Sequence, residues 1–428
     1  MAQIVPFRAY RYSSRAGDPA RLFTQPYDKI TPEMQQRYFS LSPYNLAHII
    51  RGQSNPADTE TDNVYTRAAA YLENWISTGL LTQEPEASLY AYFQKFQAPD
   101  SGRSYLRKGL IALGAVEDYS QGTVFRHELT HTGPKRDRLE LLRRTRAHCG
   151  QIFMLYDDPK LAVDACLDRV AHDAPITCVT DEYGAEHSLW RIDDPGEVAQ
   201  IQRLLAPSKL LIADGHHRYE TALAFRKGNP NLSGAAHVMM TLVNLRSPGL
   251  VILPTHRVVA NLPPFDAADV LRRAEVFFTS EVVSGPEALA EKLDRAAPDR
   301  VVVGAMLKGD PRCFVFAVDP AQLDALLPNL NVEERRLDVV ALHQVLLAQV
   351  LGLTEQAVRE ENNIRYVRGR EAAARSLEEP DVQAVFFLRP VGVQQVAEVA
   401  FSGGVMPQKS TDFYPKLLSG LTIYRIES

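Results

Sequence analysis

The pattern of apolar and polar positions along the chain predicts both helices and strands. Apolar residues at helical spacing over 64–77 fill one face of a helix. Residues 89–96 and 110–116 are rich in aromatic and β-branched side chains, which favour paired strands with a turn near 98–102. A basic amphipathic helix is expected over 137–147. This part of the chain should therefore combine a sheet with inserted helices.

The later part of the chain is also predicted to contain both strands and helices. Strands are expected at 237–244 and 250–254, joined by a hairpin turn at 246–249. Beyond residue 261 the expected helices are 264–273, 286–295, 339–351 and 371–376, and the expected strands are 301–306, 313–318 and 384–388. We therefore predict a mixed α+β fold in three parts. These are an N-terminal region (1–120), a central region (121–260) and a C-terminal region (261–428).

Composition and charge narrow the classes of function. The chain has 428 residues, of which 45% are hydrophobic and 23% charged, as is usual for a globular protein. Its net charge of −5 gives no general attraction to nucleic acids or acidic membranes, so neither is an expected partner. The chain start lacks the regions of a signal peptide, and no segment approaches about 18 uninterrupted apolar residues. We expect a cytoplasmic protein, and the sequence leaves a homodimer open.

The segment Ile212–Ala222, IADGHHRYETA, joins an apolar strand to a helix through a polar turn. The first N–H groups of a helix lack partners and its dipole is positive at that end, so a phosphate can bind there. Further donors would come from three successive side chains, His216, His217 and Arg218. An ordinary turn with Asp214 as the helix N-cap is the alternative. The run of three donors favours the phosphate site.

The string His127–Glu128–Leu129–Thr130–His131 matches the H-E-x-x-H pattern of zinc peptidases. That chemistry needs a helix, because only the i, i+4 spacing places both imidazoles on one face with the glutamate near a zinc-bound water. A strand-like run precedes the string and Gly133–Pro134 follows it, so any helix there would be short. We expect a polar loop, which leaves His127 and Glu128 available to another site.

The C-terminal string Met406–Tyr424 gathers groups that suit an anionic ligand. Lys409 is followed by two hydroxyl groups, those of Ser410 and Thr411, and Lys416 adds a second cation. The string lacks the glycines of a Walker A loop. A solvated loop bounded by prolines is the alternative interpretation.

The chain resembles, over nearly its whole length, the bacterial and archaeal family named domain of unknown function 1015. Several dispersed motifs in one order carry this likeness. They are VPFR (5–8), PYD (26–28), PYN (43–45) with His48, HE (127–128), PK (134–135), DRL (137–139), ADGHHRYETA (213–222), LDV (337–339) and MPQKSTDFYPK (406–416). Members of the family do not generally keep the second histidine of HELTH, which weakens the peptidase interpretation.

The DGHHR string also resembles the phosphate-binding turn of ParB/sulfiredoxin-like proteins, among them free-serine kinases. The resemblance implies a nucleotide-binding core in the central region, with Asp214 as a catalytic or magnesium-positioning carboxylate. The implied phosphate ligands are Gly215, His216, His217 and Arg218. A carboxylate base is expected as well, for which Glu128 is the first candidate and Glu220 the second, with His127 as a supporting group.

These features together favour a small-molecule kinase. It would use ATP or ADP with Mg²⁺ to phosphorylate a hydroxyl-bearing metabolite such as free serine. Phosphoryl transfer needs mainly positioned phosphates, a divalent cation and a base, so Asp214, Lys409 and Lys416 would join the turn in one site. Two alternatives remain, a nucleotide-binding switch without transfer chemistry and a zinc peptidase acting through HELTH.

Overall fold

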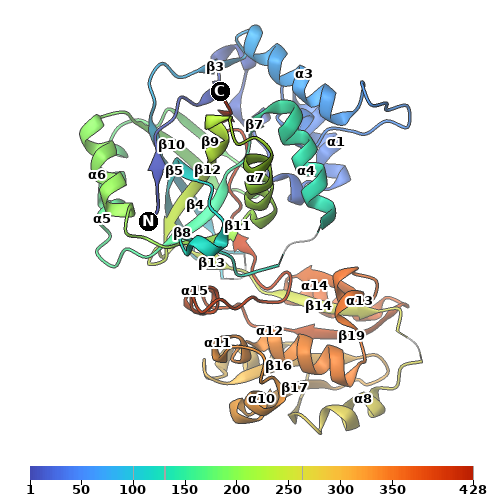
Figure 1. Ribbon diagram of the computed structural model, residues 1–428. Helices are drawn as coiled ribbons and strands as arrows, with labels where there is room; N and C mark the ends of the chain where they lie inside the picture. Colours follow the sequence, from blue (N-terminus) through green and yellow to red (C-terminus); the bar gives the residue numbers. More distant parts are fainter. Residues whose placement is uncertain (100, 130–131, 263, 428) are drawn as a thin grey trace. The chain divides into compact units, whose positions relative to one another are not determined.

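The computed structural model describes residues 1–99, 101–129, 132–262 and 264–427 and shows a mixed α+β protein, as predicted. The chain divides into two compact units, which are interleaved along the sequence. The first unit comprises residues 1–126, 130–251 and 415–428, and the second comprises residues 127–129 and 252–414. The C-terminal segment 415–428 thus returns to the first unit, where it runs beside the earlier elements (Figure 1). The division at residues 120 and 260 remains a prediction.

The first unit contains seven of the α-helices and most of the strands that the structure describes. Its helices are α1 (Pro32–Leu41), α2 (Ala47–Ile50), α3 (Val64–Ser77), α4 (Thr132–Thr145), α5 (Ala162–Val170), α6 (Pro195–Leu205) and α7 (His216–Gly228). Its strands are β1 (Ile4–Val5), β2 (Tyr10–Tyr12), β3 (Leu81–Gln83), β4 (Leu89–Gln97), β5 (Ser104–Ala115), β6 (Val124–Phe125), β7 (Ala147–His148), β8 (Ile152–Tyr156), β9 (Thr177–Thr180), β10 (Glu186–Ile192), β11 (Leu210–Asp214), β12 (His237–Asn244) and β21 (Tyr424–Arg425).

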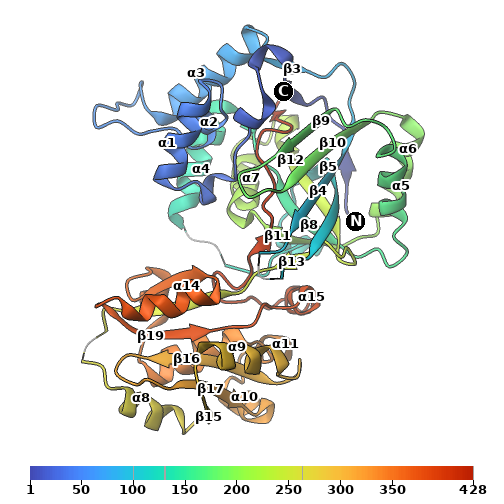
Figure 2. The ribbon, with the colours of Figure 1, turned by 180° about the vertical axis from the view of Figure 1, so that it is seen from behind.

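A mixed sheet forms the centre of the first unit. Its strands follow the order β6-β11-β8-β12-β5-β4-β10-β9, with β1 paired to β5. Side chains alternate between the two faces of each strand. On β4, Ala91 and Phe93 belong to the core that α5 and α6 cover, while the intervening Tyr92 meets the C-terminal segment. Figure 2 shows α5 and α6 packed side by side.

The second unit is built around an antiparallel sheet with the strand order β15-β17-β16-β19-β14-β18. Its strands are β14 (Thr255–Ala260), β15 (Thr279–Val283), β16 (Val301–Leu307), β17 (Cys313–Val318), β18 (Ile364–Arg368), β19 (Val382–Phe387) and β20 (Phe413–Tyr414). Its helices are α8 (Ala267–Ala274), α9 (Pro286–Arg295), α10 (Pro320–Leu326), α11 (Val332–Arg335), α12 (Asp338–Ala341), α13 (Glu355–Arg359), α14 (Arg370–Arg375) and α15 (Val393–Phe401), with a π-helix at Leu342–Val350. The short strand β13 (Val251–Ile252) lies where the chain passes from the first unit to the second.

Several predicted elements are confirmed, and one connection is wrong. The helix at 64–77 and the strands at 237–244 and 313–318 have the predicted bounds. The hairpin expected between 237–244 and 250–254 does not form, because β12 already has β5 on one side and β8 on the other. The residues at 246–249 favour a turn, but a turn signal says nothing about which strands pair, and the strands that pair with β12 are distant in sequence.

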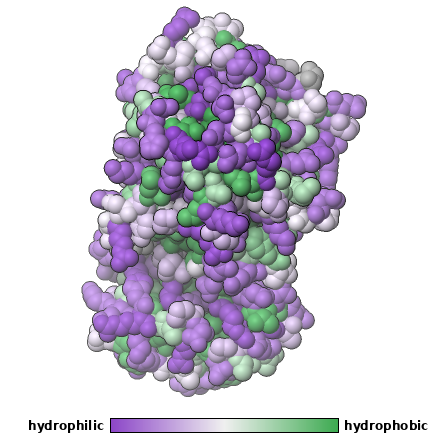
Figure 3. Space-filling model, turned by 90° about the vertical axis from the view of Figure 1, so that its left-hand side faces the viewer, coloured by the Kyte–Doolittle hydropathy of each residue, from purple (hydrophilic) through white to green (hydrophobic). Residues whose placement is uncertain are grey.

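The surface shows no broad apolar band on the face drawn in Figure 3, where hydrophobic side chains form small groups among hydrophilic ones. Among the described helices, none combines the length and the apolar composition needed to cross a membrane.

The central strand β12 supplies a test of the core. Leu242 is fully buried between Leu110 and Met154 of the neighbouring strands, whereas Leu106 on β5 is 42% exposed. We expect Leu242→Ala to lower the free energy of unfolding by about 2–5 kcal/mol, because it leaves a cavity, and Leu106→Ala to change it by less than about 1 kcal/mol. Urea denaturation of both variants checks this expectation, and equal effects would contradict the packing described.

Candidate functional site

The predicted turn lies between β11 and α7 in the first unit. Gly215 has a left-handed backbone with φ of +96°, and a Cβ there would lie 3.1 Å from the guanidinium atoms of Arg218. A residue with a side chain would be strained at this φ and would crowd Arg218, so glycine suits the position. The N–H of Tyr219 donates to the carbonyl of Gly215 at 2.9 Å and begins the helical pattern. The N–H groups before Tyr219 therefore lie at the helix start, where an anion can accept from them.

Asp214, the last residue of β11, forms an ion pair with a lysine that is distant in sequence. The Nζ of Lys416 lies 2.8 Å from Oδ2 of Asp214, and Nη2 of Arg218 lies 3.6 Å from Oδ1. Burial on its own raises the pKa of this carboxyl, but the charges of Lys416, Arg218 and Lys29 outweigh it. They hold the pKa of Asp214 well below its ordinary value. Asp214 is thus an ionised carboxylate among three cations.

The other residues of the turn are packed against the first unit. His216 is buried and His217 is half-buried. Arg218 donates through Nη1 to the carbonyl of Gln151. Glu220, the second candidate base, forms ion pairs with Lys135 and with Arg126, the latter at 3.6 Å. Lys135 lies on α4 and Arg126 lies in the segment before it, so these ion pairs connect Glu220 on α7 to both.

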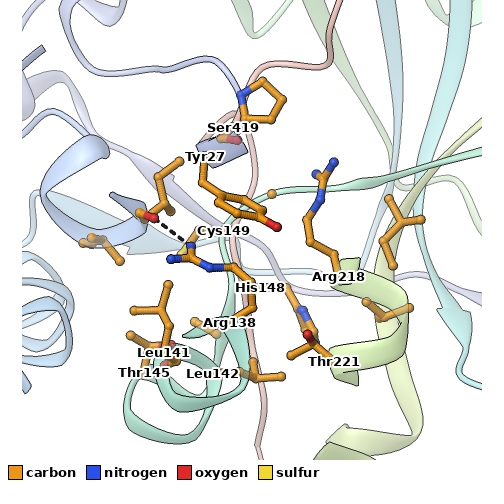
Figure 4. A pocket seen from close by; sticks show the side chains of 17 residues that line it. Tyr27, Arg138, Leu141, Leu142, Thr145, His148, Cys149, Arg218, Thr221 and Ser419 are labelled. Atoms are coloured by element: carbon orange, nitrogen blue, oxygen red, sulfur yellow. Dashed lines mark hydrogen bonds between the residues drawn. The ribbon is translucent and has the colours of Figure 1, made fainter. Parts of the chain in front are cut away.

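A pocket in the first unit shares Arg218 with the turn (Figure 4). Its cavity volume is about 70 Å³, and its walls include apolar side chains of α4 such as Leu141 and Leu142. The ring of Tyr27 lies between two guanidinium groups in Figure 4, and the guanidinium carbon of Arg138 is 4.1 Å from its ring centroid. Arg138 also donates to the carbonyl of Ile50 at 2.7 Å, the contact dashed in the figure.

The charged side chains that line this pocket are cationic. Burial raises the pKa of Tyr27 to about 12 and that of Cys149 to about 12, and it lowers the pKa of His148 to about 4. All three groups are therefore neutral near pH 7. The charged groups in the described lining are the guanidinium groups of Arg138 and Arg218, and each is paired with an aspartate outside the lining, Arg138 with Asp137 at 2.5 Å and Arg218 with Asp214 at 3.6 Å. The pocket therefore suits the anionic end of a small molecule.

The Lys409–Thr411 part of the C-terminal motif belongs to the second unit. Lys409 is exposed and has a left-handed backbone with φ of +55°. Ser410 donates to the carbonyl of Pro407, and Thr411 shares a hydrogen bond of 2.8 Å with Nε2 of His127. The N–H of Lys409 lies 3.5 Å from Oε1 of Glu128.

The HELTH string is not helical where the structure describes it. Glu128 forms a parallel β-bridge with Met406, and the N–H of Met406 donates to the carbonyl of His127 at 2.7 Å. Extended backbone places the side chains of neighbouring residues on opposite sides, so the geometry that the zinc motif requires is missing at His127–Leu129. His131 lies outside the described residues. Within the described part of the chain, no group of three or more His, Cys, Asp or Glu is arranged to hold a metal ion.

The predicted site residues are thus divided between the two units. The first unit brings together Asp214, Gly215, His216, His217, Arg218 and Lys416, with Glu220 further along α7. The second unit holds His127, Glu128, Lys409, Ser410 and Thr411. Sequence reasoning missed Lys29 and Arg138. Lys29 directly follows the PYD motif at 26–28, and Arg138 lies within the DRL motif at 137–139. Their positions in or beside these motifs could have identified both residues.

The low pKa of Asp214 predicts a pH-dependent contribution to stability. Its folded-state pKa lies below the ordinary 3.8, so the ionised form stabilises the protein above about pH 4, and this contribution is lost as the pH falls through the folded-state pKa. We expect Asp214→Asn to lower the free energy of unfolding at pH 7 and the loss to shrink below about pH 4. Urea denaturation across this range, with the exposed Asp173→Asn as control, tests it. A loss that is constant with pH would contradict the ion pair.

Comparisons with known proteins place the chain in a family. A mutant free serine kinase in complex with AMP is 14% identical, with 71% of this chain and 89% of that chain covered and a TM-score of 0.38. A mutant free serine kinase in complex with ADP is 11% identical (71% and 89% covered, TM-score 0.37). A conserved hypothetical protein from Pyrococcus furiosus is 13% identical (71% and 92% covered, TM-score 0.35). No curated protein matches the chain. The family model described as "Protein of unknown function (DUF1015)" matches residues 4–340, and the chain belongs to this family.

Proposed function

We propose that this protein is a kinase that binds a nucleotide at the Asp214–Arg218 turn and transfers phosphate to a hydroxyl-bearing metabolite such as free serine. One observation carries the proposal. At the start of α7, the cations Lys416 and Arg218 converge on one carboxylate beside the first helical N–H groups. Cations and helix N–H groups are the donors that phosphate oxygens require.

The lowered pKa of Asp214 supports a role for this residue other than proton acceptance. A carboxylate that remains ionised far below neutral pH is a weak proton acceptor, so Asp214 is poorly suited to act as a general base. It suits a magnesium ion that arrives with the nucleotide, because Mg²⁺ in phosphoryl-transfer sites usually takes one or two carboxylates together with phosphate oxygens. Such an ion would neutralise charge on the phosphates. Lys416 and Arg218 would then hold phosphate oxygens on the protein side.

The base is a separate carboxylate in this proposal. Glu220 is occupied by Lys135 and Arg126, and Glu128 belongs to the second unit. Asp28 is exposed and follows Tyr27, whose pKa responds to the charge of Asp28 as well as those of Arg218 and Asp214. We assign proton acceptance to Asp28, ahead of Glu128 and Glu220.

The acceptor would bind in the pocket that Arg138 and Arg218 line. An apolar cavity of about 150 Å³ takes a benzene ring, so a cavity of about 70 Å³ has room for roughly half as many heavy atoms. A carboxylate group has this size, so the cavity would hold the carboxylate end of serine or another short hydroxy acid and leave the rest of the molecule outside, and it excludes a purine ring. The two guanidinium groups would bind the carboxylate and leave the hydroxyl group directed toward the turn.

Nucleotide binding tests the turn directly. We expect Lys416→Met and Arg218→Ala to raise the Kd for ADP and AMP by roughly 10- to 100-fold, because each removes a charged donor worth about 1.5–3 kcal/mol. Isothermal titration calorimetry measures this effect. Lys227→Met is the matched control, because Lys227 is an exposed lysine of α7 that pairs with Asp118 at 3.0 Å. Unchanged affinity in both turn variants would remove the proposed phosphate site. Nucleotide binding with no phosphorylated product from any acceptor would contradict the kinase and favour a switch.

Steady-state kinetics with serine and other short hydroxy acids tests the acceptor assignment. We expect Arg138→Met to raise the acceptor KM at least about tenfold with little change in kcat, because it removes one carboxylate ligand. Asp28→Asn should lower kcat by roughly 10²- to 10⁴-fold with little change in KM, as expected for a lost base. Asp18→Asn, on the exposed Asp18, is the control for Asp28. If alcohols without a carboxylate are equally good acceptors, the pocket does not bind the acceptor as proposed.

A further inference from the structure

The backbone of Pro415–Leu418 has no regular pairing in the described structure, and side chains of the central sheet bind it instead. Arg107 donates to the carbonyl of Pro415, and Nε2 of Gln94 donates to the carbonyl of Lys416 at 2.9 Å. The N–H of Leu418 donates to the hydroxyl of Tyr92 at 3.2 Å. Buried backbone groups need such partners, so these three side chains fix the path of the segment that carries Lys416.

A chain of buried hydrogen bonds continues behind Tyr92. Its hydroxyl lies 2.6 Å from Nδ1 of His187, and Nε2 of His187 lies 3.2 Å from Oδ2 of Asp181. His187 is fully buried, as is the side chain of Asp181, and Tyr92 is 1% exposed. Gln25 completes this end of the chain by donating to Oδ2 of Asp181 at 3.1 Å.

The order of donors along this chain follows from its chemistry. Burial lowers the pKa of His187 even though Asp181 favours the charged form, so the ring is neutral and carries one proton. The carboxylate of Asp181 can only accept, which places that proton on Nε2. Nδ1 is then the acceptor, and it faces two donors, the hydroxyl of Tyr92 at 2.6 Å and the more distant Nε2 of Gln94 at 3.3 Å. The Tyr92 oxygen in turn presents its lone pairs to the N–H of Leu418.

We propose that Tyr92, His187 and Asp181 are positioning residues that hold Lys416 on Asp214 through the backbone of the C-terminal segment. Asp181 sets the tautomer of His187, His187 orients the Tyr92 hydroxyl, and Tyr92 fixes Leu418 two residues beyond Lys416. Because hydrogen bonds in a chain polarise one another, the loss of one member weakens the others. This hydrogen-bond relay, from Asp181 through His187 and Tyr92 to Leu418, rests on the contacts alone. Its consequence for nucleotide binding rests on the proposed function.

The reactivity of the Lys416 amine tests the relay without reference to function. Trace acetylation followed by mass spectrometry compares Lys416, whose side chain is 10% exposed, with Lys227, whose side chain is 63% exposed. We expect Lys416 to react at least about tenfold more slowly than Lys227 in the unmodified protein. In Tyr92→Phe and His187→Leu, Lys416 should react faster, so that its acetylation rate comes within about threefold of the rate of Lys227. The rate of Lys227 should not change.

Two matched variants separate positioning from general loosening of the fold. Tyr119→Phe also removes a buried hydroxyl, but no hydrogen-bond partner of that hydroxyl is found among the described residues, and Lys416 should stay protected in this variant. His187→Asn keeps an acceptor close to the position of Nδ1 and should restore most of the protection that His187→Leu loses. If Lys416 stays protected in Tyr92→Phe, or becomes equally reactive in Tyr119→Phe, the relay does not position it.

The affinity for ADP in the same variants distinguishes the relay from the proposed function. If Tyr92→Phe exposes Lys416 and also raises the Kd for ADP by about tenfold, both the relay and the phosphate site are supported. If Lys416 becomes reactive while the Kd for ADP is unchanged, the relay is supported and the role of Lys416 in nucleotide binding fails. The labelling result therefore decides the relay, and the titration decides the function.

Discussion

The ion pair between Lys416 and Asp214 is the constraint on which the arrangement of the first unit depends. Removing two charges from water is costly, and a buried pair is favourable only when its geometry and its additional hydrogen bonds are good. Lys416 can reach Asp214 only if the chain returns from the second unit and follows a fixed path across the central sheet. Arg107, Gln94 and Tyr92 provide that path by binding the backbone around Lys416.

The surplus of positive charge around Asp214 explains why an anion suits this turn. Lys416, Arg218 and Lys29 all act on a single carboxylate, so the local charge is positive even with Asp214 ionised. The start of α7 adds partial positive charge in the same place. A bound phosphate would reduce this surplus and take up the helix N–H groups. Asp214 holds Lys416 and Arg218 at the turn, and in the proposed function it would also offer an oxygen ligand to a metal ion that accompanies phosphate.

The sequence predicted the local parts of this site and missed the distant ones. An apolar run, a glycine and a helical pattern are neighbours in sequence, so the turn between β11 and α7 could be predicted from position alone. The motif also indicated that Lys416 binds an anion, but not that Asp214 is its partner in the structure. Gln94 and Tyr92 were inconspicuous, because they occupy alternate positions of an ordinary strand. Only the pairing of β4 and the return of the C-terminus give them their partners, and both contacts are long-range.

The two units fix successive parts of the C-terminal motif by the same physical means. Arg107 in the first unit donates to the carbonyl of Pro415, and Arg257 in the second donates to the carbonyls of Gln408 and Lys409. Burial lowers the pKa of both arginines to about 10, so each stays charged near neutral pH. A buried guanidinium that binds carbonyls holds irregular backbone without using a carboxylate. Carboxylates such as Asp214 are then left to face lysine and ligand, and a motif that is continuous in sequence can contribute to both units.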